Sequence, residues 1–390
     1  MVNKTALLFI LFAWSEIQAQ QLEPDSTYSI PDNLKETSGL AHFGPHFISI
    51  NDSGNPNLVI EMDHQGKFVK TYTIEKSKNS DWEDICTDPQ NNIYIGDFGN
   101  NGNKRTNLCI YKFQLGTERI YADKIDFKYS DQKSFPPAES NKNFDCEAFF
   151  WHNGKLFLFS KNNESPFSGY TKLYELSDKP GVKEAKLLDS LYLGKGGFFE
   201  HAVTAASIDR RTGMVALLTY QHLYLLYDYE GDDFFSGKML HFPMGILRQR
   251  EAILFDDKGD LWGTEEKRMA IGGNLYHYPL VKWLNGEKEY NDKSISDPMF
   301  KSDGEKGGVV ISLSFRTDLP GNYSAEIRGG QEGTFQMYQK IGIKDKKNEG
   351  KEILFGKINV PPDAVPSNSV ICIYRNNQVI FMRSLKKIIK

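Results

Sequence analysis

A short pattern recurs five times along this chain of 390 residues. It consists of an acidic or hydroxyl residue, a small or acidic residue and two mainly apolar positions, followed by a short turn. The five copies lie at 38–41, 83–86, 147–150, 204–207 and 251–254. A second pattern, centred on a leucine, follows each copy at Leu58, Leu108, Leu173, Leu223 and Leu275. Two landmarks in a constant order indicate an internal repeat, and such a repeat constrains the fold of the whole chain.

Each repeat reads as four antiparallel strands. An apolar run lies between the two landmarks, as at 47–50 and 156–159, and a more polar strand follows in most repeats, as at 68–74. Turn-forming Gly, Asn, Asp and Pro residues separate these runs. Long amphipathic helices are not predicted, and solenoid units are usually shorter and more uniform. The sequence therefore predicts an all-β fold, a β-propeller with five visible four-stranded blades. A sixth, degenerate blade remains an open alternative.

The two ends of the repeat region predict how the ring closes. The fifth repeat lacks an outer strand after 274–280, whereas 26–34 forms an extended segment before the first repeat. Pairing these segments would close the ring and remove two exposed strand edges.

The N-terminus has the features of a secretory signal peptide. Lys4 precedes the apolar run 6–14, and cleavage is expected just after Ala19 or Gln20. No other stretch approaches the ~20 apolar residues of a membrane span. We therefore expect an exported chain, periplasmic or extracellular, with no transmembrane span after cleavage. The net charge of −4 gives no reason to expect nucleic acid as a partner.

The sequence divides into a signal peptide and three further segments. The signal peptide covers 1–20, the propeller 21–285 and a polar linker 286–308. Alternating strands separated by Pro-Gly, Gly-Gly and Asn-Asn turns then predict a small β-sandwich-like domain at 309–390.

The four cysteines lie inside apolar strand patterns and not at the spacing of metal ligands. This favours buried thiols. An exported location permits one disulfide, whose pairing the sequence leaves open.

Propeller geometry brings residues distant in sequence to one mouth of the central channel. In each blade the innermost strand starts where the second strand ends. The predicted innermost ring is Ser38, Glu83, Glu147, Thr204 and Glu251, and the second ring is Asp52, Asp97, Lys161, Tyr220 and Glu265. Arg105, Arg250 and Lys267 are the basic residues expected nearby.

Carboxylates that face a narrow channel repel one another, so water, a cation or raised pKa values must relieve the repulsion. Calcium is the cation we expect, because it accepts hard oxygen ligands in a loose arrangement. The predicted metal ligands are Glu83, Glu147, Glu251, Asp52 and Asp97. The alternative is that the three glutamates accept backbone hydrogen bonds from the neighbouring blade and fasten the ring.

Four residues are candidates for catalysis or for binding an anion. Lys161, Arg105 and Arg250 would suit an anionic ligand such as a phosphate ester, and His201 is the histidine expected to act as a base at this mouth. A hydrogen-bonded structural role is the alternative for His201. The sequence contains no phosphate-binding loop, nucleophile elbow or zinc-protease motif.

Several motifs in the first three repeats carry a family resemblance. They are 51–54 (Asn-Asp-Ser-Gly), 81–85 (Asp-Trp-Glu-Asp-Ile), 96–101 (Gly-Asp-Phe-Gly-Asn-Asn) with Arg105, and 145–148 (Asp-Cys-Glu-Ala). Together they resemble exported bacterial propellers of the SdiA-regulated and phytase-like esterase kind, over roughly 34–285. The resemblance implies an exported, calcium-associated propeller that hydrolyses phosphate esters or lactones. Ser38 and Thr204 depart from its glutamate pattern.

Two functional hypotheses follow. The first is a binding or scaffold propeller that presents an acidic mouth to an ion, a small anionic ligand or an envelope protein. The second is a calcium-dependent hydrolase of phosphate esters or lactones. The sequence leaves open whether the protein is an enzyme.

Overall fold

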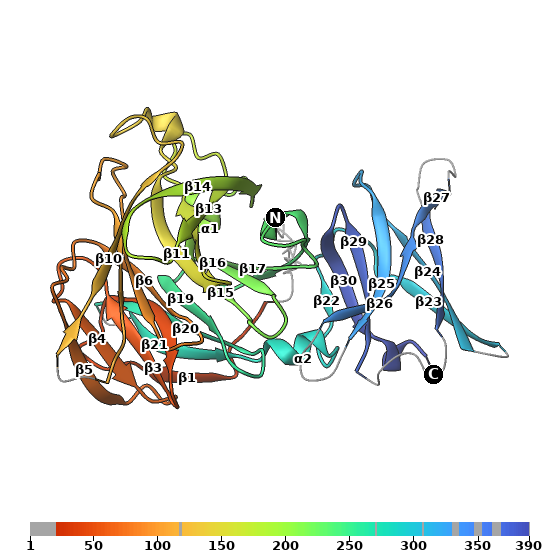
Figure 1. The fold of residues 1–390 in the computed structure, drawn as a ribbon. Helices are drawn as coiled ribbons and strands as arrows, with labels where there is room; N and C mark the ends of the chain where they lie inside the picture. Colours follow the sequence, from red (N-terminus) through yellow and green to blue (C-terminus); the bar gives the residue numbers. More distant parts are fainter. Residues whose placement is uncertain are drawn as a thin grey trace, which may run out of the picture.

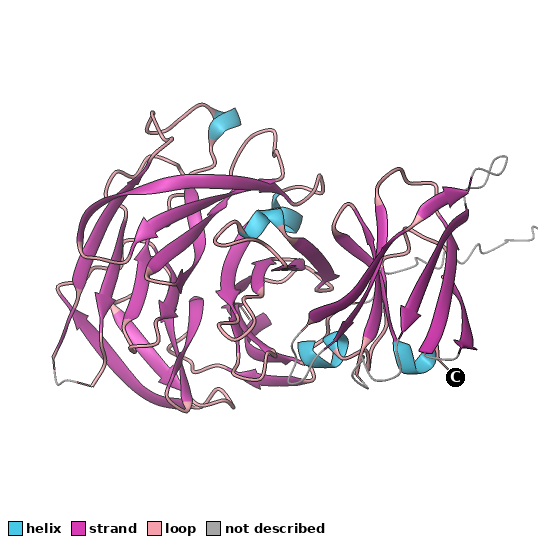
Figure 2. Cartoon of the chain, turned by 45° about the vertical axis from the view of Figure 1, so that its right-hand side comes forward, coloured by secondary structure: helices cyan, strands magenta, loops and turns pink. Residues whose placement is uncertain are grey.

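The computed structural model describes residues 21–116, 119–269, 271–305, 308–329, 335–346, 353–360 and 368–389. The predicted signal peptide lies outside the described residues. The described chain forms a ring of small sheets with a second, smaller domain beside it (Figure 1). Strands make up both domains, and the few helices are short (Figure 2). The all-β class predicted from the repeat is confirmed.

Each blade has four strands. The first contains β2 (Thr37–Phe43), β3 (His46–Asn51), β4 (Leu58–Met62) and β5 (Phe68–Glu75). The second contains β6 (Trp82–Thr87), β7 (Ile93–Asp97), β8 (Cys109–Phe113) and β10 (Asp123–Tyr129), and β9 (Ile120–Tyr121) pairs with β5. The third contains β11 (Asp145–His152), β12 (Lys155–Lys161), β13 (Tyr170–Ser177) and β14 (Gly181–Tyr192).

The fourth and fifth blades complete the ring. The fourth contains β15 (Val203–Ile208), β16 (Val215–Thr219), β17 (His222–Tyr227) and β18 (Lys238–Pro243). The fifth contains β19 (Arg250–Phe255), β20 (Leu261–Arg268), β21 (Ile271–Tyr278) and β1 (Ser26–Ser29). The innermost strands contact one another in the order β2, β6, β11, β15, β19 and back to β2. Within the described residues the propeller therefore has five blades, and no sixth blade lies between them.

The ring closes as the sequence predicts. Strand β1 pairs antiparallel with β21 and places Ser26 opposite His277. Asp25 Oδ1 lies 2.7 Å from Nδ1 of the same histidine. Upstream of β1, the Leu22 amide donates to the Pro243 carbonyl at 3.1 Å, and the Leu22 side chain is buried with the fourth and fifth blades.

The innermost strand of every blade contains a β-bulge at the mouth. Its pairing with the second strand skips one residue, and the skipped residues are Gly39, Glu83, Glu147, Thr204 and Glu251. A bulge leaves one residue out of the ladder and redirects its side chain. Four of the five positions are those predicted for the innermost ring. In the first blade the skipped residue is Gly39 and not Ser38, so the predicted alignment was off by one there.

The C-terminal domain is a two-layered β-sandwich. One sheet consists of β22 (Tyr290–Asn291), β30 (Gln378–Ser384), β29 (Val370–Arg375), β25 (Tyr323–Gly329) and β26 (Gln336–Gly342). The other consists of β23 (Met299–Glu305), β24 (Gly308–Arg316), β28 (Ile353–Val360) and β27 (Lys344–Lys346). The predicted linker 286–308 contributes β22 and β23 to these sheets. The backbone of β22 pairs with β30, and that of β23 pairs with β24.

Polar contacts join the sandwich to the fourth blade. Strand β30 pairs in parallel with β18, and Met239 lies opposite Gln378. Arg328 is fully buried, donates from Nε to Glu326 Oε2 at 2.8 Å and forms an ion pair with Asp228 of the propeller. Lys238 lies 2.7 Å from the same aspartate and 2.8 Å from Glu326. The two domains therefore share a continuous nine-stranded sheet.

The remaining elements are short. They are α1 (Phe198–His201), α2 (Leu280–Leu284) and three 3₁₀ turns at Glu139–Asn141, Phe234–Ser236 and Leu385–Lys387. Among the described residues no helix combines the length and the apolar character required to cross a bilayer. All four cysteines are free thiols, and three of them are buried, as the strand patterns predict.

The closure predicts a large effect of truncating Leu22. Leu22→Ala should lower the free energy of unfolding by about 2–5 kcal/mol, because it removes a fully buried side chain from the joint between blades. Urea denaturation followed by tryptophan fluorescence measures this loss. The matched control is Leu319→Ala, whose side chain is 42% exposed and which should stay within about 0.5 kcal/mol of the parent. Equal effects of the two variants would contradict the proposed role of this segment.

Candidate metal and ligand site at the channel mouth

A cavity of about 680 Å³ opens at the mouth where the innermost strands begin. The residue types at its wall are mainly carboxylates, basic groups and aromatic rings. Eight predicted residues line it: Ser38, Asp52, Glu83, Glu147, Lys161, Tyr220, Glu251 and Glu265. The geometric argument that first-strand starts and second-strand ends converge at one mouth is therefore confirmed for these eight.

Three carboxylates from two blades meet at one side of this cavity. Asp52 follows β3, Asp81 precedes β6, and Glu83 occupies the bulge of β6. One oxygen of each lies within 4.8 Å of the other two. Burial and the neighbouring charges of Glu147, Asp52 and Asp81 hold the pKa of Glu83 well above its ordinary value. Burial and Asp52 raise the pKa of Asp81 to about 6, although Arg105 opposes the shift.

Gly99 keeps space open for this cluster. A Cβ added to Gly99 would lie 2.0 Å from Glu83 Oε1 and 2.6 Å from Asp81 Oδ2. Gly39 permits a different close approach: it has a φ of +88°, and a Cβ there would lie 2.6 Å from the Ile85 amide nitrogen and 2.7 Å from Asp84 Oδ1 of the neighbouring innermost strand. Glycine is required at both positions for a close approach, and the first blade therefore presents no side chain at its bulge.

The opposite side of the cavity contains a buried cation. Lys161, at the end of β12, forms an ion pair with Glu147 and donates to the Tyr220 hydroxyl at 2.8 Å. Its side chain is only 6% exposed. Burial disfavours the charged amine, but Glu147 and the other acidic groups outweigh this effect and hold the Lys161 pKa well above its ordinary value. The amine is therefore a permanent positive charge in the cavity.

Two further carboxyl groups lie between these sides. Burial raises the pKa of Glu251 to about 8, with Lys161 opposing the shift. Burial and Asp52 raise the pKa of Glu266 to about 7. Both groups line the cavity. At neutral pH the mouth can therefore hold protons on carboxyl groups while Lys161 stays charged.

The five predicted metal ligands do not converge on one point. Glu147 pairs with Lys161, and Glu251 lies outside the three-carboxylate cluster. Asp97 is occupied by Arg105, whose Nη2 lies 2.7 Å from its Oδ1, and by the Asp81 amide at 3.1 Å. We predicted Asp97 at the mouth because it ends a second strand, but its side chain binds Arg105 and the Asp81 amide below the cluster. Of the predicted set, only Asp52 and Glu83 belong to the cluster.

The candidate catalytic residues also separate. Lys161 lines the cavity, whereas Arg105 supports the loop through Asp97 and the Gly99 carbonyl at 2.7 Å. Arg250 is buried and donates to the carbonyls of Tyr220, Met244 and Ile246. It holds the loop before β19, and its guanidinium does not line the cavity.

His201 does not reach the mouth. Its Nδ1 lies 2.8 Å from the Tyr224 hydroxyl, inside the fourth blade. The neighbouring Phe198 and Phe199 of α1 line the cavity instead. The prediction of His201 as a base at this mouth is therefore wrong, because the chain turns at α1 and directs the imidazole away from the channel.

Other residues fasten the blades to one another. The Ser38 hydroxyl donates to the Glu83 carbonyl, and the Thr204 hydroxyl donates to the Arg250 carbonyl at 2.7 Å. Asp84 accepts from the Phe149 amide at 3.0 Å. In the described residues none of the three bulge glutamates accepts a backbone hydrogen bond from a neighbouring blade. The carboxylates at the mouth are therefore not used to hold the ring together.

Sequence reasoning missed Asp81, Glu266 and the basic residues Arg248 and Arg268. The first could have been found from strand alternation, because residues two apart point to the same side and Asp81 lies two positions before Glu83. The others lie on the loop before β19 and on the long β20–β21 hairpin. Exposed apolar side chains also line the cavity: Phe199, Leu247, Met269 and Ile271.

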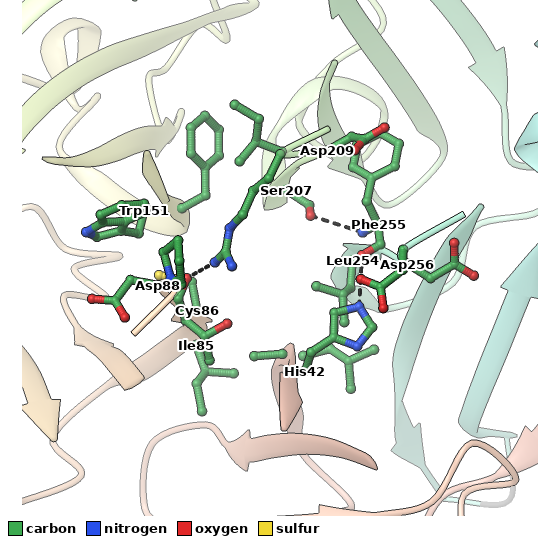
Figure 3. Close-up of a pocket in the computed structure, with 18 of the residues that line it drawn as sticks. His42, Ile85, Cys86, Asp88, Trp151, Ser207, Asp209, Leu254, Phe255 and Asp256 are labelled. Atoms are coloured by element: carbon green, nitrogen blue, oxygen red, sulfur yellow. Dashed lines mark hydrogen bonds between the residues drawn. The ribbon is translucent and has the colours of Figure 1, made fainter. Parts of the chain in front are cut away.

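A second cavity of about 580 Å³ lies at the opposite end of the channel (Figure 3). Side chains there bind the backbone of the neighbouring blades: the Ser207 hydroxyl accepts from the Phe255 amide at 3.1 Å, and His42 Nε2 lies 3.0 Å from the Phe255 carbonyl (Figure 3). Arg210 covers Trp151 and donates to the Thr87 carbonyl. Asp256, at its edge, is used by the turn that follows β19. The group of three carboxylates is thus a feature of the first mouth.

Comparisons with known proteins give only a general similarity of shape. No family model and no curated protein matches the sequence. An oxidoreductase (glucose dehydrogenase) of Thermus thermophilus is 10% identical, with 65% of this chain and 99% of that chain covered and a TM-score of 0.39. A gluconolactonase structure is 11% identical. The match covers 67% of this chain and 91% of that chain, and its TM-score is also 0.39. The PQQ-bound aldose sugar dehydrogenase of Streptomyces coelicolor is 12% identical. The match covers 85% of this chain and 96% of that chain, with a TM-score of 0.35. At these values the similarity has no bearing on the function of this chain, and the resemblance to SdiA-regulated propellers stays a prediction.

The raised pKa of Glu251 predicts a pH dependence of stability. The folded-state pKa of about 8 exceeds that of an unfolded glutamate, near 4.3. The stabilisation is therefore complete below about pH 4 and is lost as the pH rises towards 8. In a chelator, Glu251→Gln should reduce this loss by on the order of 2 kcal/mol. Urea denaturation between pH 5 and 8.5 measures this loss of unfolding free energy in the parent and in Glu251→Gln. The control is Glu75→Gln, on the exposed side of β5. An unchanged pH slope in Glu251→Gln would contradict the shift.

Proposed function

We propose that the propeller binds a calcium ion at Asp52, Asp81 and Glu83 and uses this mouth to bind a small anionic ligand. The carboxylate cluster supports the proposal, because one oxygen of each of the three carboxyl groups lies within 4.8 Å of the other two. Arg105 neutralises this cluster only at its edge: its Nη1 is 3.8 Å from Asp81 Oδ2 and donates to the Gly99 carbonyl, while its Nη2 pairs with Asp97 at 2.7 Å. A divalent cation would relieve the mutual repulsion that, together with burial, raises the pKa values of Asp81 and Glu83.

The donor set suits calcium. Calcium takes six to eight oxygen ligands in a flexible arrangement, and carboxylates bind it through one or both oxygens. Asn101 also lines the cavity and offers an amide oxygen. Gly99 leaves the centre of the cluster free of side-chain atoms. The residues present therefore fit the ion.

The remaining wall suits a ligand with an anionic group and an apolar portion. Lys161 supplies a buried charge, and Arg248 and Arg268 lie at the opening. Phe198 and the exposed apolar side chains line the cavity. We propose that this binding function operates outside the cytoplasm, as the predicted signal peptide implies.

Calcium binding should depend on Asp81. For the chain from residue 21, a hundredfold excess of calcium over its dissociation constant should add ~2.7 kcal/mol to stability. Differential scanning fluorimetry with calcium and with chelator should show this rise in the parent and lose most of it in Asp81→Asn. Asp123→Asn, at the exposed start of β10, is the matched control. An equal rise in parent and Asp81→Asn would disprove the site.

A second candidate function is hydrolysis of phosphate esters or lactones. It is favoured by Glu251, which lines the same cavity and has a pKa of about 8. A carboxyl group that is protonated at neutral pH can donate its proton to a leaving group. Bound calcium would polarise the substrate oxygen, while Lys161 would orient the anionic group.

This alternative predicts calcium-dependent turnover of a phosphate monoester or a sugar lactone. Glu251→Gln should lower kcat by about 10²- to 10⁴-fold, because the amide cannot donate a proton, and should leave the calcium-induced rise in melting temperature intact. The assay compares parent and variant with calcium and with chelator. Failure of the parent to turn over either substrate class would reject the alternative and leave the binding function.

A further inference from the structure

A second group of ligand-type side chains lies in the fourth blade, outside the wall of the mouth cavity. Glu200 and His201 are the last two residues of α1, and His222 is the first residue of β17. One ligand atom from each lies within 4.8 Å of the other two. None of the three lines the cavity described above, so the group is separate from the carboxylate cluster.

The local geometry brings the three side chains to one side. The imidazole rings of His201 and His222 are nearly parallel, with centroids 5.3 Å apart and planes at 12°. Glu200 Oε2 lies 3.7 Å from His201 Nε2. Two glycines make room for these atoms: an added Cβ would lie 2.3 Å from His201 Nε2 at Gly194, and 1.6 Å from Glu200 Oε2 at Gly196.

Hydrogen bonds orient both imidazole rings from behind. The Tyr224 hydroxyl donates to the Leu193 carbonyl at 3.4 Å, so it can accept a proton from His201 Nδ1 at 2.8 Å. The Nε2 atom of His201 then carries the free lone pair. On His222, Nδ1 lies 2.9 Å from Nε2 of His241. With the shared proton on His222, its Nε2 is also free. Metal-binding histidines are commonly held in this way by a partner on the other ring nitrogen.

We propose that Glu200, His201 and His222 bind one Zn²⁺ ion, or a divalent ion of similar preference. Two imidazoles and one carboxylate form a common zinc ligand set, with a water or another ligand in the fourth position. Metal–ligand distances of about 2.0–2.2 Å require the three atoms to move closer together. Glu200, whose side chain is 44% exposed, is free to make this movement.

The ion would link α1 to β17. The same helix carries Phe198 and Phe199, which line the cavity mouth. Zinc would therefore fix the aromatic part of the mouth from the outside, while calcium would occupy its acidic part. The ligand types keep the two ions apart, because imidazole nitrogen suits zinc whereas calcium prefers oxygen.

Zinc titration of the tag-free chain from residue 21 tests this assignment. Isothermal titration calorimetry should show one Zn²⁺ per parent chain. His222→Ala should weaken binding by more than 100-fold, and His241→Phe, which removes only the supporting hydrogen bond, should weaken it by roughly 10- to 100-fold. Bound Co²⁺ should give a visible absorption band in the parent and not in His222→Ala. A rise in melting temperature with zinc should follow the same order.

Two controls make the result specific. His152→Ala removes a histidine from the third blade and should bind zinc like the parent. Asp81→Asn should also keep zinc binding, which separates this site from the calcium proposal. Absence of saturable zinc binding to the parent would overturn the inference. Equal zinc affinity of the parent and His222→Ala would also overturn it. If His277→Ala lost zinc binding instead, the ion would belong to the group of Asp256, Asp260 and His277.

Discussion

The closed ring of five innermost strands is the constraint on which the rest of the structure depends. Each of these strands has a β-bulge at the equivalent position, where one residue is left out of the hydrogen-bonded pairing. The bulge places that residue at the mouth of the channel. Side-chain hydrogen bonds between neighbouring blades then fix this position, as Ser38 does on the Glu83 carbonyl and Thr204 on the Arg250 carbonyl. Among the described residues, the bulge glutamates Glu83, Glu147 and Glu251 accept no backbone hydrogen bond from a neighbouring blade, and they remain buried with raised pKa values.

Charge is distributed unevenly around this ring. On the side of the first two blades, Gly39 supplies no side chain, and three carboxyl groups approach one another with Arg105 only at the edge, 3.8 Å from Asp81. On the side of the third and fourth blades, Lys161 is enclosed by Glu147 and Tyr220. Burying a charge without a partner is costly, so the acidic side either holds protons or holds a cation. This asymmetry, and not the acidic composition alone, makes the mouth a candidate binding site.

The repeat was sufficient to predict the propeller, because its two landmarks correspond to the innermost and third strands of each blade. Closure by the 26–34 segment was also predictable, since one repeat lacked an edge strand and one segment lacked a sheet. The linker was misjudged, because composition reports polarity and not pairing. Within 286–308, β22 and β23 complete sheets whose other strands come from distant sequence.

The candidate site could be predicted only in part, because position around a ring does not decide which charged groups pair. Asp97 and Arg105 were both placed near the mouth, yet they neutralise each other below it. Arg250 was expected to meet a ligand but is occupied by three carbonyls of a loop whose path the sequence does not show. His201 was assigned by its distance from Thr204 along the chain, and one turn of helix was enough to direct it elsewhere.

The fourth blade differs from the others in both chemistry and connections. Its bulge carries Thr204 instead of a carboxylate, its outer strand β18 continues into the sandwich through β30, and its histidines gather where α1 meets β17. Strand β17 pairs with β18 along its whole length, and the ion pair between the buried Arg328 and the partly exposed Asp228 joins the sandwich to the propeller just beyond its end. Phe198 at the mouth is therefore connected through α1 and a single continuous sheet to the C-terminal domain. The fourth blade is thus the part of the ring that is hydrogen-bonded to the sandwich, through the single strand pair Met239–Gln378.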